Sequence, residues 1–173
     1  KLISGGGYLW SRLFKRSLLE GLSFREHVIL EDMEVLMILF MRTNTLGTCK
    51  KTLYKYSASP TSASRPKNPY YYHKNIIEAM KAVYQSMSVL PNYATIQDAV
   101  EYSILYLYQC GLISALHPDN ALSSKKQAQF VHELFHLQQQ MIQLPYMKNP
   151  YVIQKFSKED LSLISTIHKQ LQN

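Results

Sequence analysis

The chain has 173 residues, of which 46% are hydrophobic and 18% are charged, and its net charge is +7. This composition excludes an intrinsically disordered chain, and the length suffices for one domain with a sizeable core. No apolar run reaches the roughly 18 residues that would indicate a membrane span. The two cysteines, Cys49 and Cys110, form neither a disulfide framework nor a zinc pattern and fit a reducing compartment.

The first 70 residues carry most of the positive charge, with 11 lysines and arginines against 5 acids. A helix is expected over residues 11–22, because a serine can cap it and Gly21 can end it. A second helix is expected over residues 32–44, where apolar side chains recur at helical spacing. The alternating residues 48–56 predict a strand, and the proline-containing residues 59–69 predict a loop.

After Pro69 the sequence becomes helical in character, with 8 lysines and arginines against 7 acids in residues 71–173. Prolines and the stretch "LPYMKNP" separate the expected helices, which span residues 73–90, 93–116, 123–144 and 158–172. Short connections between them favour an antiparallel helical array. The expected fold class is therefore mainly α with a short β element.

The stretch "VHELFHL" contains an H-E-x-x-H pattern that is typical of zinc peptidases. His132 and His136 would share a helix face and could bind Zn²⁺, with Glu133 as the general base. Glu159 is a candidate third ligand, although "SKEDLSLIS" around it lacks a supporting glycine or histidine framework. A zinc peptidase and a helix with incidental surface histidines both remain open.

Basic and aromatic residues also alternate in "NPYYYHK" (residues 68–74). These tyrosines could stack on bases, or they could pack the first long helix onto its neighbours. A non-enzymatic basic helical module that binds nucleic acid or partner proteins is therefore a further alternative.

Three carboxylates, Glu31, Asp32 and Glu34, interrupt the apolar run "ILEDMEVLMIL". Acids in the first turn of a helix are favoured by its unpaired N–H groups and its dipole, typically by about 0.3–1 kcal/mol. The Glu31–Asp32 pair, however, follows "HVIL", which should lead into the core. A part-buried carboxylate at a helix N-terminus can be held ionised and oriented, as a general base requires.

Five stretches, in order, resemble bacterial family 2 glycosyltransferases of the GT-A fold. They are "WSRLFKR" (10–16), Phe24, the Glu31–Asp32 pair that opens a helix, "LYKY" (53–56) and "SAS" (62–64). The resemblance covers about residues 5–66 and looks like the second half of that catalytic domain. Two positions depart from the family pattern. Arg12 stands where a lysine is usual, and "YSAS" (56–59) replaces an arginine-containing strand exit, with Arg65 and Lys67 as nearby substitutes.

The resemblance implies inverting transfer of a sugar from a nucleotide-sugar donor to a glycan acceptor in bacterial surface polysaccharide synthesis. By position, Asp32 would be the base that takes the proton from the acceptor hydroxyl, and Glu31 would position it or contact the acceptor. Trp10 would wall the acceptor pocket or pack against the strand, and Arg65 would contact the donor phosphates. Glu34 has no role in the family and is expected to be a helix-start residue only.

Such enzymes hold the nucleotide diphosphate through Mg²⁺ or Mn²⁺ bound by a D-x-D motif. That motif is absent, since the aspartates stand alone at positions 32, 98, 119 and 160, so no metal ligand is expected in this chain. Residues 1–68 would be the acceptor-side part of the GT-A domain, and residues 69–173 a helical C-terminal extension. The intact enzyme would act in the cytoplasm or peripherally at the inner membrane face, without a nucleic-acid partner. The chain alone should be inactive and should self-associate through residues 1–60.

Overall fold

The structure is a computed structural model, and it describes residues 8–55, 57, 69–120 and 122–172. Its described residues contain six α-helices: α1 (Glu31–Arg42), α2 (Pro69–Ser88), α3 (Tyr93–Leu116), α4 (Ser124–Met141), α5 (Pro150–Lys155) and α6 (Lys158–Gln172). Three short 3-10 helices complete the set: η1 (Leu9–Ser11), η2 (Arg16–Leu19) and η3 (Tyr146–Lys148). No strand occurs in the described ranges, so the expectation of a mainly α fold is confirmed.

Residues 11–22 and 48–55 do not form the helix and the strand that their patterns predict. The first range holds only the end of η1 and all of η2. Leu13 is fully exposed and Leu19 is also exposed, so most of the expected apolar helix side is not buried, and short helices are marginal without packing. A strand needs a neighbouring strand for its N–H and C=O groups, and no described segment provides one for residues 48–55. Tyr56 lies outside the described residues.

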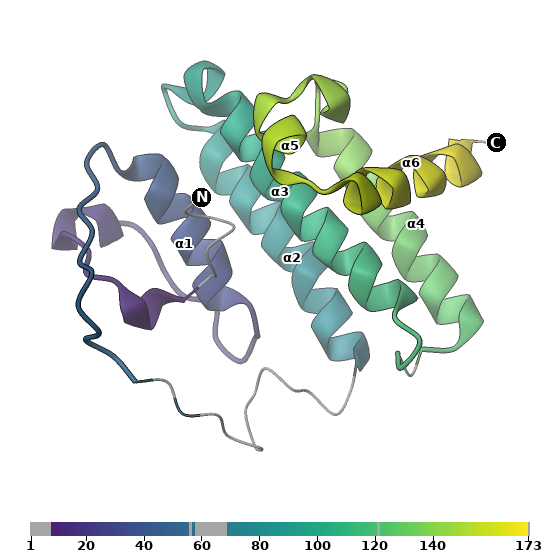
Figure 1. Ribbon diagram of the computed structural model, residues 1–173, viewed down its shortest axis with the longest axis horizontal. Helices are drawn as coiled ribbons and strands as arrows, with labels where there is room; N and C mark the ends of the chain where they lie inside the picture. The colour runs from purple at the N-terminus through teal and green to yellow at the C-terminus, as the bar shows by residue number, and fades with distance from the viewer. Residues whose placement is uncertain (1–7, 56, 58–68, 121, 173) are drawn as a thin grey trace.

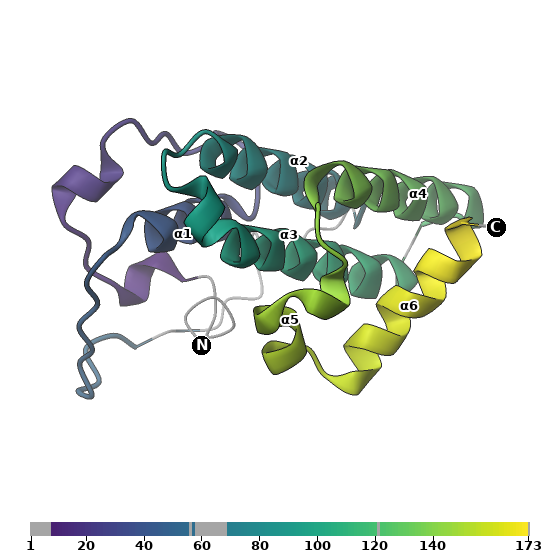
Figure 2. The same cartoon turned by 90° about the horizontal axis from the view of Figure 1, so that it is seen from above.

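Helix α3 runs through the centre of the molecule and packs against α1, α2, α4 and α5 (Figures 1 and 2). Among the described helices it is the one long and apolar enough to cross a membrane, with a mean hydropathy of 1.2. Within the protein, 67% of that apolar stretch is buried. A helix that is apolar around its whole circumference is expected where neighbours surround it.

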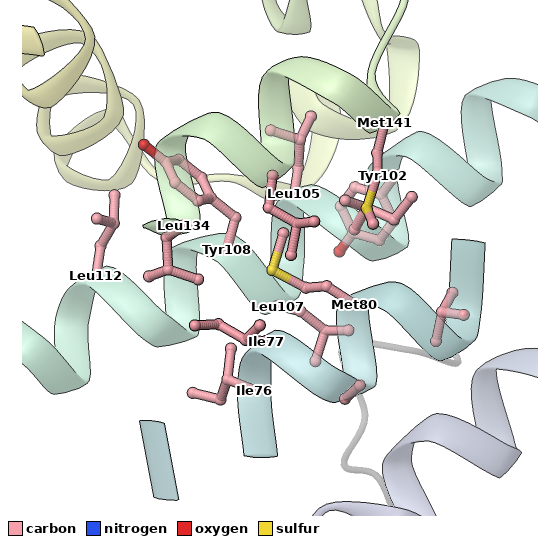
Figure 3. Packing of buried hydrophobic residues seen from close by; sticks show 14 of the residues in the cluster. Ile76, Ile77, Met80, Tyr102, Leu105, Leu107, Tyr108, Leu112, Leu134 and Met141 are labelled. Carbon is pink, nitrogen blue, oxygen red and sulfur yellow. The ribbon is translucent and has the colours of Figure 1, made fainter. Parts of the chain in front are cut away.

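Helix α1 packs on α2 and α3 and also contacts η1 and η2, so it connects the N-terminal segments to the helical core. Its Met37 and Ile38 belong to the same buried cluster as the apolar residues of α2, α3 and α4, whose side chains fill the space between those helices in Figure 3. The buried Asn75 of α2 accepts a hydrogen bond from the N–H of Ile29 at 3.3 Å, which fixes the connector (residues 20–30) between η2 and α1. One core thus contains residues from both sides of the domain boundary expected between residues 68 and 69. The domain boundary itself stays a prediction.

Helices α3 and α4 approach each other closely at Gly111. A Cβ atom built on Gly111 would lie 2.7 Å from Cδ1 of Leu134 and 3.4 Å from Cγ2 of Ile76. Both neighbours are fully buried, so neither has free space to move into. The missing side chain of Gly111 therefore sets how near α2, α3 and α4 can lie.

The break predicted at "LPYMKNP" (144–150) is present between α4 and α5, and it contains η3, whereas α5 itself was not predicted. Asn149 caps α5, because its Oδ1 accepts the N–H groups of Tyr151 at 3.0 Å and Val152 at 3.3 Å. Its Nδ2 donates to the carbonyl of Asp98 on α3 at 2.7 Å. An asparagine followed by Pro150 is a signal for the start of a helix, since proline is favoured at the first helical position.

Candidate functional site

Asp32 lies in the first turn of α1 and is partly buried. Its Oδ1 accepts the N–H of Met33 at 2.8 Å, one of the first-turn donors that have no partner inside a helix. Burial raises the pKa of Asp32, the Met33 bond opposes that change, and the negative charge of Glu31 raises the pKa again. The raised pKa makes this carboxylate a stronger proton acceptor than an ordinary aspartate.

The backbone just before the Glu31–Asp32 pair is in the left-handed region. Leu30 has φ 71° and His27 has φ 56°, values that residues other than glycine rarely adopt. Each such residue costs about 1–3 kcal/mol, and such residues cluster at functional sites. Leu30 is also the N-cap of α1, and its side chain makes no capping hydrogen bond. This strained connector fixes the direction in which the first turn of α1 presents its carboxylates.

Glu34 is not an exposed helix-start residue, because its side chain is 7% exposed and forms an ion pair with Arg25. Its Oε2 lies 2.6 Å from Nη2 and 2.8 Å from Nε of Arg25. The pair ties the connector to α1 across nine residues. Sequence reasoning missed Arg25, because that spacing matches no helical or strand repeat that would bring the two side chains together.

Trp10 stacks on Tyr54, with ring centroids 4.3 Å apart and an interplanar angle of 28°. The ring of Tyr8 lies beside this stack, with its centroid 5.1 Å from that of Trp10. The stack brings together "WSRLFKR" and "LYKY", two of the five stretches that carry the resemblance. Trp10 does not pack against a strand, since residues 48–55 contain none. The three rings remain between 41% and 52% exposed, so they form an aromatic surface rather than a core.

The residues that follow Trp10 lie beside the second half of α1. The guanidinium of Arg12 sits 5.5 Å from the ring centroid of Phe40. Arg42, at the end of α1, donates to the carbonyl of Glu20 at 3.0 Å. Asp32 precedes Phe40 by eight residues, which is about 12 Å along a helix axis. The structure thus brings Trp10 and Tyr54 together but leaves Asp32 at the other end of α1.

The remaining predicted residues of this site are Glu31 and Arg65. Glu31 is partly buried next to Asp32 in the first turn of α1. Arg65, Lys67 and the "SAS" stretch lie outside the described residues. The structure therefore describes the acceptor-side residues of the prediction and not its donor-phosphate contact.

His132, Glu133 and His136 lie on the exposed face of α4. The two imidazole rings are neighbours, with centroids 6.2 Å apart, as the i, i+4 spacing predicts. A zinc site needs at least three protein ligands, and the described part of the chain contains no cluster of three His, Cys, Asp or Glu side chains. The described residues place no third ligand beside the two histidines, and the zinc-peptidase alternative stays a prediction.

A serine and a histidine also meet between α2 and α3. Nε2 of the buried His73 lies 2.9 Å from Oγ of Ser114, and burial lowers the pKa of His73. The ring of Phe130 packs on His73 at 4.6 Å. Ser114 lies within α3, where the backbone N–H groups bond within the helix and offer no oxyanion donors. This pair therefore links two helices rather than activating a nucleophile.

Two surface hollows lie away from Asp32. One is lined by α2 and α4 residues that include Lys74, Lys126 and Glu133. The other is open and includes Ser114 and Cys110. Burial raises the pKa of the Cys110 thiol to about 11, so this cysteine stays protonated at neutral pH.

Comparisons of the chain with protein families, curated proteins and solved structures returned no match. A function is therefore indicated by the resemblance over about residues 5–66 and by the setting of the residues that carry it.

Proposed function

We propose that this chain is part of an inverting glycosyltransferase in which Asp32 is the general base. Asp32 takes the proton of an acceptor hydroxyl while that oxygen attacks the anomeric carbon of a nucleotide-sugar. The bond from the anomeric carbon to the donor phosphate breaks, and the nucleoside diphosphate leaves with the electron pair. The acceptor is a glycan of bacterial surface polysaccharide synthesis, and the intact enzyme acts in the cytoplasm or at the inner membrane face.

The setting of Asp32 is the observation that carries this proposal. The carboxylate is partly buried, is held by a first-turn N–H group, and has a raised pKa because of that burial. The strained backbone at Leu30 directly precedes the Glu31–Asp32 pair. Glu34, two residues later, is neutralised by Arg25, so of the two only Asp32 keeps a carboxylate that is not committed to an ion pair among the described residues.

The proposal assigns residues 1–68 to the acceptor-side part of a GT-A domain and residues 69–173 to a helical extension arranged as an antiparallel array. The stacking of Trp10 on Tyr54 supports it, because two stretches of the family pattern meet although 44 positions separate those residues. A diphosphate-bound Mg²⁺ or Mn²⁺ would need residues of another part of the enzyme. The described residues offer no three-ligand cluster. The chemistry proposed for this chain lies mainly on the acceptor side, with Arg65 as its contact to the donor phosphates.

A transfer assay on the intact enzyme with Asp32→Asn tests the proposal. Turnover should fall by about 10²–10⁴-fold, the usual contribution of a general base. The KM for the nucleotide-sugar should hardly change, because donor binding lies mainly in the other half of the enzyme.

Glu26→Gln is the matched control, since Glu26 is an exposed acid of the same connector. Its turnover should equal that of the unmodified enzyme. Near-normal transfer by Asp32→Asn would show that the Glu31–Asp32 pair is not the catalytic pair.

A further inference from the structure

Two segments of the chain expose apolar side chains among basic ones. Residues 8–19 contain Arg12, Lys15 and Arg16, and residues 43–55 contain three lysines. Neither segment contains an acidic residue. Their large exposed apolar residues are Tyr8, Trp10, Leu13, Leu19, Leu46, Leu53 and Tyr54. We call these two segments the basic face.

The stack of Trp10 on Tyr54 holds the two segments together. Both lie at the end of the molecule that is farthest from α6 (Figures 1 and 2). Leu13 is 102% exposed and Leu53 is 78% exposed, so each side chain projects fully or almost fully from the surface. The basic face therefore combines projecting leucines, partly exposed aromatic rings and charges of one sign.

This combination suits an anionic lipid surface more than other partners. Lysine and arginine near such a surface contribute about 1 kcal/mol each, apolar side chains enter the acyl boundary, and tryptophan and tyrosine favour the headgroup level. In a two-fold dimer through this face, the same basic patches would oppose each other, and like charges disfavour that contact. For nucleic acid, Trp10 and Tyr54 already stack on each other, and the projecting leucines would have no apolar counterpart.

We propose that the basic face docks on membranes that contain anionic phospholipid. In this arrangement Leu13 and Leu53 enter the lipid, and the lysines and arginines beside them contact the phosphate groups. Docking does not depend on Asp32, which lies at the opposite end of α1, so it stands or fails separately from glycosyl transfer.

The single tryptophan of the chain reports on this contact directly, because Trp10 lies within the basic face. The protein is mixed with vesicles of phosphatidylcholine containing phosphatidylglycerol, or with phosphatidylcholine alone. With the anionic vesicles we expect co-sedimentation and a blue shift of the Trp10 emission, both weakened by added salt. With phosphatidylcholine alone, binding should be at least about tenfold weaker, since the charge contribution is lost.

Two double variants separate the apolar and the charged contributions. Leu13→Ser with Leu53→Ser should abolish the blue shift, and Lys51→Glu with Lys55→Glu should weaken binding to anionic vesicles by at least about tenfold. All four side chains are exposed, so the fold should not change. The matched controls are Val89→Ser, in the connection between α2 and α3, and Lys125→Glu, on α4. Both positions are exposed, and both variants should bind vesicles like the unmodified protein.

Three outcomes would overturn the proposal. Absence of binding to anionic vesicles is the first. Equal loss of binding in the control variants is the second, because the contact would then not involve the basic face. The third is concentration-dependent dimerisation that the Leu13 and Leu53 changes abolish while vesicles bind no protein, which would make a second copy the occupant of this face.

Discussion

At the scale of single residues, two carboxylates on the same turn of α1 have different surroundings. Glu34 is neutralised by Arg25, whereas Asp32 is partly buried and bonds only a backbone N–H among the described contacts. A pKa raised in the folded state means that the unfolded chain releases the Asp32 proton more readily. Ionised Asp32 therefore opposes folding: the cost begins as the pH rises above its unfolded-state pKa and is complete above its folded-state pKa.

Asp32→Asn should accordingly keep or raise the melting temperature while it lowers transfer. The amide oxygen can still accept the Met33 N–H, and the cost of burying a charge disappears. Thermal unfolding at pH 7 measures this. A clear drop in the melting temperature would mean that the carboxylate stabilises the first turn of α1 instead.

Glu34→Gln should destabilise the fold by about 1–3 kcal/mol, because it leaves the guanidinium of Arg25 without its charged partner. Urea unfolding at neutral pH measures the loss. Glu26→Gln, at an exposed position of the connector, should change stability by less than about 0.5 kcal/mol. Equal stability of the two variants would mean that the Arg25 pair is only a surface contact.

At the scale of elements, the long periodic helices could be predicted from sequence, whereas the structure of residues 11–22 and 48–55 could not. The expected bounds of α3 and α6 agree with the structure, and α1, α2 and α4 differ by a few residues at their ends. Their apolar residues repeat at helical spacing over many turns, and packing follows that repeat. The apolar residues of 11–22 and 48–55 have no such repeat to define a buried face, and Leu13 and Leu53 end up exposed. The stacking of Trp10 on Tyr54 is a long-range contact that no local pattern indicates.

The approach of α3 to α4 gives a prediction at this scale. Gly111→Ala should destabilise the protein by about 1 kcal/mol. Overpacking against the buried Leu134 costs about 1–3 kcal/mol. This cost exceeds the stabilisation of about 0.5–1 kcal/mol that alanine gives over glycine within a helix. Chemical unfolding measures the change. Gly47→Ala is the control, since its Cβ would meet nothing within 4 Å. A Gly111→Ala variant that is more stable would show that Leu134 can move aside.

At the scale of the whole molecule, buried histidines connect the core to pH. His73 lies between α2, α3 and α4, and His168 of α6 is surrounded by the rings of Tyr108, Phe135 and Tyr146. Burial lowers the pKa of both histidines. Nδ1 of His73 and Nε2 of His168 have no hydrogen-bond partner among the described residues. Protonation of either imidazole in the folded state would therefore place a poorly compensated positive charge in the core.

The contribution of these histidines to the free energy of unfolding should consequently be constant above pH of about 6.5, the ordinary histidine value, and should fall as the pH drops below it. In that range the unfolded chain binds protons that the folded chain does not. Urea unfolding at a series of pH values between about 5 and 8 measures this pH dependence of the free energy of unfolding. His168→Phe should reduce the slope, whereas His132→Gln, at an exposed position of α4, should leave it unchanged. A slope that both variants share with the unmodified protein would assign the pH dependence to other groups.

The two cysteines differ so much in their surroundings that the chain has one natural attachment point for a chemical label. Cys49 is exposed, while the Cys110 thiol has a pKa of about 11 and stays protonated at neutral pH. Maleimides react with the thiolate, so Cys49 should be modified first without any substitution. A spin label or an energy-transfer acceptor placed there would lie on residues 43–55, within the same face as Trp10. Depth in a bilayer and distance to the indole could then both be measured on the unmodified sequence.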